Sequence, residues 1–370
     1  MRVLFDAYWF IAGPPSQRHV LREMVSSWIA EFPGDEVGLV VRAKHLAEAR
    51  AELDGDIAVF PSRAYPQALL ASTHLSRIGR RWNADVVVAH NYTPRYRRGI
   101  SAVFLHDVLF LDNPEWFTKV ERLYFGVMPW LAPRADIVFT SSATEADRIR
   151  RRTRSRDVVP VGIGLSRELI ESAPLDALDG DLAHLRPQRY VLAVGRLNVR
   201  KNLARVISAC LSTGAVTPEN PLVIVGSGDG RAEDHRPELR SAVDSGAVIF
   251  AGFVTDQKLR WLYENSSCMV FASLGEGFGM PPVEAAFFGT EIVVSDLPVF
   301  RETVGDTAFF VDPLSEESIG SGIRAAISAA QLRGGRRPVS DWVRRFNWKT
   351  SVGLMRSAVE AKRRERGQAE

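Results

Sequence analysis

The stretch VLAVGRLNVRKNLARVISA, residues 191–209, predicts a strand, a tight loop and a helix in succession. An apolar run ends at Val194, Gly195 follows as a turn residue, and the helical pattern begins near Asn202. A short apolar strand with a helix directly after it is the unit from which parallel sheets are built. The loop therefore leaves the carboxyl end of its strand, which is the edge at which open α/β sheets bind ligands.

The same alternation of apolar strands and helical stretches runs through the whole chain. Strands are predicted at residues 2–7, 36–41, 57–60, 85–89, 102–106, 137–140, 190–194, 221–226, 247–252, 268–273, 291–295 and 308–311. Helices of the first half are predicted near residues 17–32, 67–82, 117–132 and 143–152. Continuous apolar strands bounded by helices indicate parallel sheets that are covered on both faces. The predicted fold class is α/β, with doubly wound, Rossmann-like parallel sheets.

A stretch rich in Gly, Pro, Asp and Ser, residues 162–188, separates the two halves. We expect an amino-terminal domain over 1–165, a linker over 166–188 and a second domain over 189–340. Each half has roughly 160 residues, which is enough for a core of its own. The tail, 341–370, predicts helices with no strand after them, and such a helix can cross between two domains.

Composition excludes several classes of protein. The chain has 370 residues, of which 46% are hydrophobic and 25% charged, and these ordinary values exclude a disordered, collagenous or coiled-coil chain. The net charge of +3 gives no argument for nucleic-acid binding, and Cys210 and Cys268 show no metal-ligand spacing. No apolar run reaches the ~18 residues of a transmembrane helix, and Asp6 interrupts the apolar start of the chain. We expect a cytoplasmic protein, with peripheral membrane contact left open.

Two cations occupy the loop after the strand that ends at Val194. Arg196 and Lys201 lie between a strand's carboxyl end and a helix's amino end, whose N–H groups attract anions. Arg binds a phosphate through two parallel hydrogen bonds and Lys binds it as a point charge, so the pair suits a diphosphate. The alternative is an ordinary solvated loop.

A second motif, FASLGEGFGMPPVEAAFFGTEIVVSD (271–296), carries two carboxylates in a glycine-rich setting. Glu276 is predicted in a loop at a strand end, and Glu284 lies one turn into a helix whose first turn contains two prolines. The loop between them consists of Gly277, Phe278, Gly279 and Met280. Its glycines allow backbone N–H groups to approach a ligand without a Cβ in the way. Carboxylates accept hydrogen bonds from paired sugar hydroxyls, and the alternative is two solvated side chains.

These motifs resemble those of a known family. GRLNVRKN (195–202) followed by EGFGMPPVEAAFFGT (276–290) is similar to the retaining glycosyltransferases of the GT-B fold, family 4, also called glycosyl transferases group 1. The resemblance continues through 253–279 and 294–313, and so covers the second half almost without a break. In the first half it is thinner, where FLHDVLFLDNPEWF (104–117) resembles the His-Asp segment of the family.

The resemblance implies two Rossmann-like domains that face a central cleft, with the donor mainly on the second domain and the acceptor on the first. Arg196 and Lys201 are implied to contact the donor diphosphate, and Glu276 to contact hydroxyls of the donor sugar. Glu284 is implied to contact the nucleotide ribose. His106 is implied to line the reaction centre from the first domain.

Two loops are implied to present backbone to the donor. The backbone N–H groups of Gly277–Met280 match those that approach the sugar and phosphates in the family. The family usually has a glycine-rich turn after its first strand, and this chain has Gly13-Pro14-Pro15-Ser16 there. Gly13 is the candidate in that turn, whereas Pro14 and Pro15 have no N–H to offer a phosphate.

The activity implied is hexosyl transfer from a nucleotide sugar to a saccharide or lipid-linked saccharide acceptor, with retention, in polysaccharide or glycoconjugate biosynthesis. The continuation NPEWF (113–117) is similar to mannosyl- and rhamnosyl-transferring members, which favours GDP-mannose as the donor. No separate cofactor is expected, and no metal, because Arg196 and Lys201 can balance the diphosphate charge. The alternatives are a non-catalytic nucleotide-sugar-binding partner and a GT-B-fold nucleotide-sugar epimerase.

Two further patterns have simpler explanations. Acidic triplets at 54–56 and 179–181 are of the kind that hold a divalent metal in the other large glycosyltransferase fold, and we expect both to be turns that arose by chance. The run RIRRRTRSR (148–156) predicts a solvated helix face, with attraction to anionic lipid headgroups as the alternative.

Overall fold

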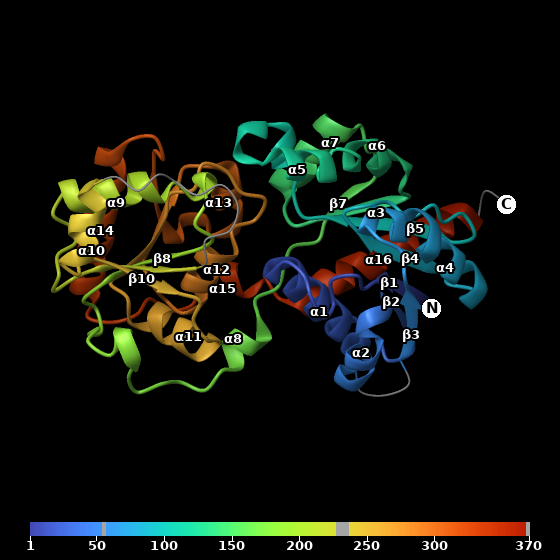
Figure 1. Cartoon of the computed structure of the whole chain (residues 1–370), viewed down its shortest axis with the longest axis horizontal. Coiled ribbons are helices and arrows are strands. Elements are labelled where there is room, and N and C mark those ends of the chain that lie inside the picture. Colours follow the sequence, from blue (N-terminus) through green and yellow to red (C-terminus); the bar gives the residue numbers. More distant parts are fainter. Residues whose placement is uncertain (54–56, 227–236, 368–370) are drawn as a thin grey trace. The chain divides into compact units, whose positions relative to one another are not determined.

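The computed structural model describes residues 1–53, 57–226 and 237–367, which form two compact units (Figure 1). Unit 1 comprises Met1–Asp112, Lys119–Gly164 and Phe346–Glu370. Unit 2 comprises Asn113–Thr118 and Leu165–Arg345. The stretch expected to link the domains, 166–188, thus belongs to unit 2.

The described residues of unit 1 form a seven-stranded parallel sheet. In sheet order its strands are β3 (Ala58–Ser62), β2 (Glu36–Arg42), β1 (Arg2–Asp6), β4 (Val86–His90), β5 (Ile100–Leu105), β6 (Ile137–Thr140) and β7 (Val158–Pro160). In the register of the sheet, Phe5 of β1 lies between Leu39 of β2 and Val88 of β4. Every residue of β4 and β5 is buried, as expected of strands that are covered on both faces.

Unit 1 also contains helices of different lengths. Those of unit 1 are α1 (Pro15–Glu31), α2 (Leu46–Glu52), α3 (Gln67–Leu69), α4 (Ser76–Trp82), α5 (Lys119–Phe125), α6 (Met128–Leu131), α7 (Ala143–Thr153) and α16 (Trp348–Gly367). The single helix predicted near 117–132 is wrong, because the structure has the separate helices α5 and α6 there. Gly126 lies between them, and Pro129 has no N–H for a continuous helix.

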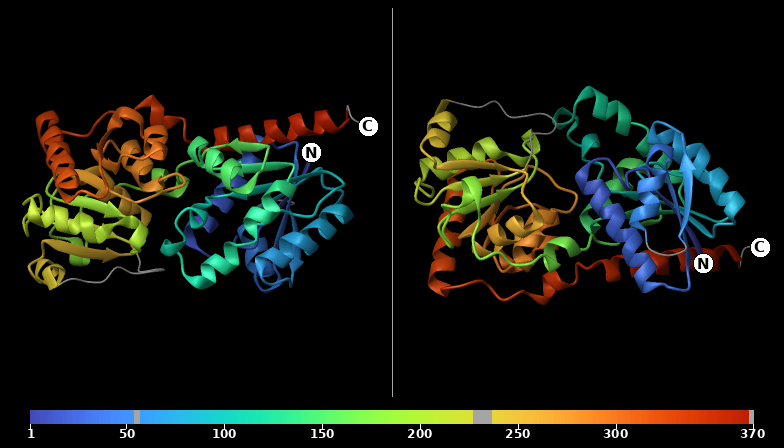
Figure 2. Two further views of the ribbon diagram at one scale, coloured as in Figure 1. Left: turned by 90° about the horizontal axis from the view of Figure 1, so that it is seen from above. Right: turned by 60° about the horizontal axis from the view of Figure 1, so that its bottom comes forward.

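The last helix, α16, packs against α1 within unit 1 and runs along this unit in both views of Figure 2. Arg356 donates to Asp35 at 3.0 Å, and Arg363 donates to Asp85 at 2.9 Å. A Cβ on Gly164 would lie 2.4 Å from the backbone nitrogen of Trp348, so only glycine allows this approach. The chain therefore returns from unit 2 to unit 1 just before α16.

Unit 2 contains a six-stranded parallel sheet in its described residues. In sheet order its strands are β10 (Val248–Gly252), β9 (Leu222–Val225), β8 (Val191–Val194), β11 (Cys268–Phe271), β12 (Ile292–Ser295) and β13 (Ala308–Val311). Its helices are α8 (Arg167–Glu171), α9 (Leu203–Ser212), α10 (Pro237–Asp244), α11 (Asp256–Asn265), α12 (Met280–Phe287), α13 (Pro298–Thr303), α14 (Glu316–Arg333) and α15 (Asp341–Arg344). The predicted α/β class with two doubly wound parallel sheets is confirmed.

In both sheets the strand order changes direction once. The reversal lies between β1 and β4 in unit 1 and between β8 and β11 in unit 2. At such a point the loops that leave the two strands diverge, and a crevice opens at their carboxyl ends. The two sequence motifs, 191–209 and 271–296, border the reversal of unit 2, because the loop of the first follows β8 and the loop of the second follows β11.

Candidate functional site

The loop after β8 approaches a neighbouring loop through backbone alone. Gly195 has φ +152° and Gly226, which follows β9, has φ +144°. A Cβ on Gly226 would lie 1.9 Å from the carbonyl oxygen of Gly195. Glycine is therefore required where the two loops touch.

Lys201 is the last residue of a 3-10 turn, η7 (Val199–Lys201), and Asn202 alone separates it from α9. The turn is capped by Asn198, whose side chain accepts a hydrogen bond from the Lys201 N–H. Asn202 follows with φ +58° and donates its side-chain amide to the carbonyl of Ala272 at 3.0 Å. This bond ties the loop after β8 to the end of β11.

Glu276 is the centre of a charged cluster at this point. Its Oε1 accepts from Lys201 Nζ at 2.7 Å and from the Ser273 hydroxyl at 2.8 Å. Its Oε2 accepts from Arg200 Nη1 at 2.8 Å. The backbone adds a further link, because the N–H of Leu274 donates to the carbonyl of Arg200 at 2.8 Å.

Burial and charge act against one another in this cluster. The Glu276 side chain is 8% exposed, and burial opposes its ionisation, but the charges of Arg200 and Lys201 outweigh burial and hold the pKa at about 2. Burial lowers the pKa of Lys201 to about 8, although the charge of Glu276 acts to raise it. Arg196 is half-buried, and its charge also lowers the pKa of Lys201. A buried, paired carboxylate and several cations thus meet at one strand end.

Glu284 lies in a different environment from Glu276. It is in α12 and accepts a hydrogen bond from the Tyr263 hydroxyl at 2.8 Å. Burial raises the pKa of Glu284 to about 7, against the effect of the Tyr263 hydrogen bond. The carboxyl group therefore changes charge near neutral pH.

The loop that joins the two carboxylates is buried at Gly277, Phe278 and Gly279, and Met280 is half-buried. Gly279 has φ +87°, and a Cβ there would lie 2.5 Å from the Phe300 ring. Both the backbone conformation and the close ring require glycine at this position.

His106 lies in unit 1, directly after β5. Burial lowers the pKa of its imidazole to about 4, although the charge of Asp107 acts to raise it. Its Nε2 is buried and has no hydrogen-bond partner among the described residues. The segment after it is held by Glu145, which accepts from the backbone N–H of Val108 at 2.8 Å.

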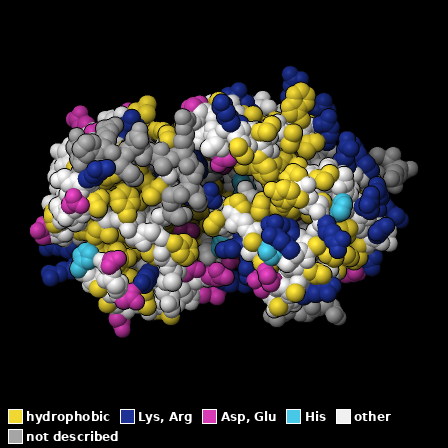
Figure 3. Space-filling model, viewed as in Figure 1, with side chains coloured by type: hydrophobic (Ala, Val, Ile, Leu, Met, Phe, Trp, Pro, Cys, Tyr) yellow, Lys and Arg dark blue, Asp and Glu magenta, His cyan; other side chains and the backbone are white. Residues whose placement is uncertain are grey.

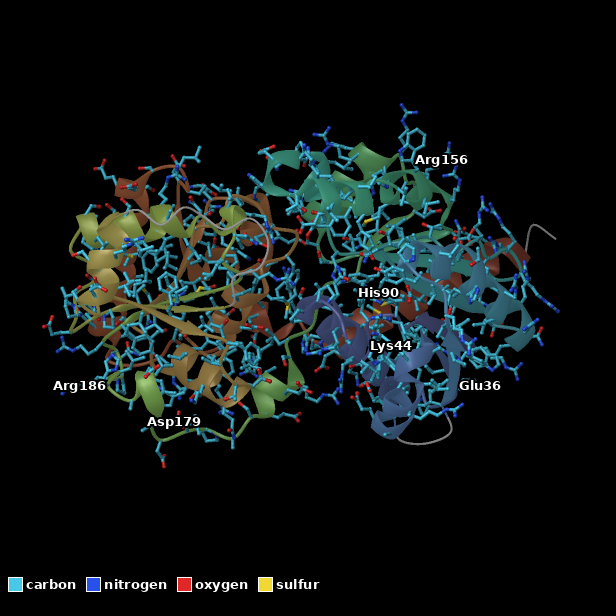
Figure 4. All side chains as sticks on the ribbon, in the orientation of Figure 1. Glu36, Lys44, His90, Arg156, Asp179 and Arg186 are labelled. Carbon is cyan, nitrogen blue, oxygen red and sulfur yellow. The ribbon has the colours of Figure 1, made fainter. Side chains whose placement is uncertain are left out.

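A second imidazole lies close to His106, and sequence reasoning gave it no role. His90 ends β4, and its ring centroid is 5.9 Å from that of His106 (His90 is labelled in Figure 4). Burial, together with the neighbouring His106, lowers the pKa of His90 to about 3. Both imidazoles are therefore neutral at pH 7, and the buried Nε2 of His90 also has no partner among the described residues.

Gln67 links the ends of two strands in the same unit. Its amide nitrogen donates to Asp6 Oδ2 at 2.9 Å and to the carbonyl of His90 at 3.2 Å. Its carbonyl oxygen accepts from Trp9 Nε1 and from the Tyr124 hydroxyl, each at 3.1 Å. Burial raises the pKa of Asp6 to about 6, against the hydrogen bond from Gln67. No spacing in the sequence connects these residues.

The remaining candidates make no contact with the cluster that the structure records. Gly13 is exposed and precedes α1, and a Cβ on it would lie 2.2 Å from the Trp9 ring. Asp179 is exposed and forms an ion pair with Lys258 (Asp179 is labelled in Figure 4), and the triplet at 54–56 lies outside the described residues. Among the residues that the structure describes, no group of three His, Cys, Asp or Glu side chains has the geometry to hold a metal ion.

Part of the arginine run at 148–156 is paired within unit 1. Arg148 and Arg152 bind Asp112 at 2.9 and 2.5 Å, and Arg150 binds Asp147 at 2.8 Å. No described helix is both long enough and apolar enough to span a membrane.

The structure brings together Lys201 and Glu276, and adds Arg200, which sequence reasoning missed although it precedes Lys201 in the quoted motif. Glu284 contacts Tyr263 rather than this cluster. His106 and Gly13 belong to the other unit. The roles assigned to these residues toward a donor stay predictions.

Residues 178–334, which lie in unit 2, match the family described as Glycosyl transferases group 1. A serotype-specific mannosyltransferase of Escherichia coli, WbdA, is 25% identical over 277 residues, which cover 70% of this chain and 33% of WbdA. The chain thus matches about a third of the length of that relative. The O-antigen chain mannosyltransferase RfbU of Salmonella typhimurium is 26% identical over 275 residues, which cover 72% of each chain.

Solved structures agree on the fold. The HepE protein of Anabaena, solved in complex with UDP and glucose, superposes with a TM-score of 0.61 at 18% identity and covers 100% of this chain and 99% of its own. At 18% identity this similarity is evidence for the fold alone. It supports the predicted GT-B assignment of two Rossmann-like domains.

Proposed function

We propose that this protein is a retaining glycosyltransferase that moves a hexosyl residue, mannose from GDP-mannose in the favoured case, to a saccharide or lipid-linked saccharide acceptor in polysaccharide or glycoconjugate biosynthesis. The observation that carries the proposal is the cluster of Lys201, Arg200 and Glu276 at the strand reversal of unit 2. This cluster lies inside the segment that matches glycosyl transferases group 1. The mannosyltransferases among the relatives favour mannose.

In the proposed reaction the bond between the anomeric carbon and the diphosphate breaks, and a bond from that carbon to an acceptor hydroxyl oxygen forms. Negative charge develops on the leaving phosphate oxygen. Lys201 and Arg196 would stabilise it, and fixed cations aimed at developing charge are among the strongest contributions to catalysis. The acceptor's proton passes to the leaving phosphate oxygen, which allows attack on the same face and hence retention.

Glu276 has two tasks in this scheme. Before the donor arrives it neutralises Lys201 and Arg200. Once the diphosphate occupies the cations, the same carboxylate can accept hydrogen bonds from the donor sugar's hydroxyls. Glu284 would do the same for the ribose, and the backbone of the buried glycine loop would approach the phosphates.

The neutral imidazole of His106 supports its predicted role, which is to line the reaction centre from unit 1. Its buried Nε2 has no hydrogen-bond partner among the residues that the structure describes, and burial keeps the ring neutral at pH 7. A neutral imidazole can exchange a hydrogen bond with a sugar hydroxyl without adding a charge that would attract the departing phosphate. We propose no separate cofactor and no metal for this chemistry.

The test combines binding with turnover. GDP-, UDP- and dTDP-sugars are compared by thermal shift, because a ligand that binds the native state raises its melting temperature, by about 5 °C at one hundred times Kd. Lys201→Ala should lose the shift and about 100-fold in transfer, while Lys258→Ala, which removes another ion-paired lysine of unit 2, should keep both. Stabilisation without turnover would favour a non-catalytic binding partner, and an epimerised donor would favour the epimerase. Normal transfer by a folded Lys201→Ala protein would contradict the proposal.

A further inference from the structure

The surface of unit 1 is hollowed at the amino ends of β4 and β5. The hollow has a volume of about 760 Å³, which is in the range of sites that bind small molecules. Its lining comes from the turn between α4 and β4, the loop before β5 and the last turns of α16, all of which belong to unit 1. His90 and His106 lie at the carboxyl ends of the same two strands. The hollow is therefore distinct from the predicted reaction centre.

Positive charge predominates in this hollow. Arg97 and Arg98 line it from the loop before β5, and Arg363 and Arg366 line it from α16. Asp85 is the one acidic residue among the described residues of the lining. Arg97 and Arg98 are exposed, and neither forms an ion pair with a residue that the structure describes. The basic hollow, as we call it, thus carries more positive charge than its own carboxylate balances.

Short contacts hold the two sides of the basic hollow together. Arg366 donates to the carbonyl of Gly99 at 2.6 Å and to Asp136 at 2.5 Å. A Cβ on Gly99 would lie 2.3 Å from the carbonyl oxygen of Asp85, so glycine is required where the loop before β5 passes this residue. These contacts fix that loop beside the last turns of α16.

Arg363 can turn from its internal partner to an anion at little cost. It donates to Asp85 at 2.9 Å, and the two side chains are 44 and 32% exposed. An ion pair as exposed as this one contributes little to stability. Asp85 also accepts from the backbone N–H of Arg2 at 2.7 Å, so its carboxylate keeps a partner when Arg363 moves. Three guanidinium groups, from both sides of the hollow, can therefore meet one anion.

The surroundings add charge but no exposed apolar surface within the hollow. Arg77, Arg80 and Arg81 of α4 are exposed, and Figure 3 shows Lys and Arg gathered over the end of unit 1 that carries α4. The described residues that line the hollow include no aromatic side chain, and Ala84 and Ile100 are buried. A nucleotide base would find no ring to stack on, and an acyl chain no apolar surface. The lining therefore favours a small, soluble, highly charged anion.

We propose that the basic hollow binds a soluble anion with two or more phosphate groups. Guanidinium groups bind phosphate oxygens through two parallel hydrogen bonds, and a chain of phosphates can meet cations on both sides of the hollow at once. The bound anion would join Arg97 and Arg98 to Arg363, and so would tie the end of α16 to the loop before β5. This site is independent of the proposed function, because it uses none of the residues assigned to the donor.

Isothermal titration with sodium tripolyphosphate tests the proposal. The wild type should bind tripolyphosphate about tenfold more tightly than orthophosphate, which is too short to meet both sides of the hollow. Arg97→Gln with Arg98→Gln should lower the affinity for tripolyphosphate about tenfold. The matched control, Arg151→Gln with Arg154→Gln, removes two other exposed arginines of unit 1 that form no ion pair with a described residue. This control should change the affinity less than about twofold, because screening limits the reach of distant charges.

Two further variants locate the bound anion. Arg363→Gln should lower the affinity about threefold, because it removes a cation from the α16 side of the hollow. Lys201→Ala should leave this binding step in place, whether or not the protein transfers a sugar. Tripolyphosphate binding that Lys201→Ala abolishes and the Arg97 and Arg98 variant retains would overturn the proposal and leave the proposed function intact.

Melting curves verify that each variant is folded, and tripolyphosphate should raise the melting temperature of the wild type more than that of the Arg97 and Arg98 variant. Absence of wild-type binding to tripolyphosphate would overturn the proposal. Equal affinity in the wild type and the folded Arg97 and Arg98 variant would overturn it as well.

Discussion

The side-chain nitrogen of Lys201 lies 2.7 Å from Oε1 of Glu276, and this ion pair joins the loops that follow two neighbouring strands of unit 2. The same carboxylate accepts from Arg200 at 2.8 Å. Glu276 is therefore the internal counter-ion of two cations at the place where an open α/β sheet binds its ligand. An anion that reaches Lys201 must compete with this carboxylate.

That competition gives the first prediction. Glu276→Gln should raise the affinity for a free nucleoside diphosphate about threefold to tenfold, because the cations lose their internal counter-ion. Transfer should fall about 100-fold, because the sugar loses a charged hydrogen-bond acceptor. Isothermal titration with GDP and UDP measures the affinity, and a transfer assay at saturating donor measures the turnover.

The melting temperature provides a control for Glu276→Gln. Without Glu276 the half-buried Lys201 and Arg200 keep their charges but lose their carboxylate partner, and removal of one partner of a buried pair is destabilising. The melting temperature of Glu276→Gln should therefore fall, and a nucleoside diphosphate should restore more of it than it adds to the wild type. A variant that binds nucleoside diphosphate more weakly than the wild type would contradict the counter-ion role.

Most of the fold is predictable from hydrophobic patterning. All twelve predicted strands are present, since a parallel strand covered on both faces leaves a continuous apolar run. The strand β7 was missed because Val158 and Val159 are its only apolar residues before Pro160. The helix near 117–132 was predicted without a break because its apolar residues keep a helical spacing across Gly126.

The candidate site is less predictable, because its contacts depend on strand order. Lys201 and Glu276 could each be singled out by their motifs, but that they touch follows from β8 and β11 being neighbours in the sheet. Gln67 could not be found at all. Its partners Asp6 and Tyr124 come from separate elements, and a buried amide leaves no periodic signal.

The second prediction concerns Glu284 and pH. Burial raises the pKa of Glu284 from 4.5 to about 7. Between these two pH values the carboxyl group is protonated in the folded protein and ionised in the unfolded chain. If its carboxylate accepts a ribose hydroxyl, the affinity for nucleoside diphosphate should rise between pH 6 and 8 in the wild type. In Glu284→Gln this rise should be absent and affinity lower throughout. Isothermal titration across this range measures both.

The melting temperature tests the same ionisation independently. Native Glu284 binds more protons than the unfolded state between about pH 4.5 and 7, so its contribution to stability falls as pH rises through that window. Glu284→Gln should therefore gain stability relative to the wild type from pH 5 to pH 8. Glu317→Gln, at an exposed position of α14, is the control and should show no such trend. A flat difference for Glu284→Gln would argue against the raised pKa.

The third prediction concerns the link made by Gln67. Gln67→Leu removes the donor to Asp6 and the acceptor for Trp9 and Tyr124, which leaves buried polar groups without partners. We expect a loss of about 3 kcal/mol in the free energy of unfolding, measured by urea denaturation. The loss should be larger at pH 8 than at pH 5, because ionised Asp6, whose pKa is about 6, needs the donor most.

An exposed amide gives the comparison for this variant. Gln331→Leu, in α14, should change the free energy of unfolding by less than about 0.5 kcal/mol at either pH. If Gln67→Leu lost the same free energy of unfolding at both pH values, the ionisation of Asp6 would not contribute to the loss.

The last prediction is that EDTA does not abolish transfer. A divalent ion is needed at a diphosphate leaving group when the protein supplies too little positive charge of its own. Here Arg196, Arg200 and Lys201 follow one strand end, and a diphosphate that displaces Glu276 would meet the latter two directly. Asp179, one of the two carboxylates of the acidic triplet that the structure describes, already forms an ion pair with Lys258. Transfer measured with and without EDTA should therefore differ by less than about threefold, which allows for a metal that helps the product leave. Complete loss in EDTA, restored by Mg²⁺ or Mn²⁺, would contradict this account, and Asp179→Asn would then show whether that carboxylate holds the ion.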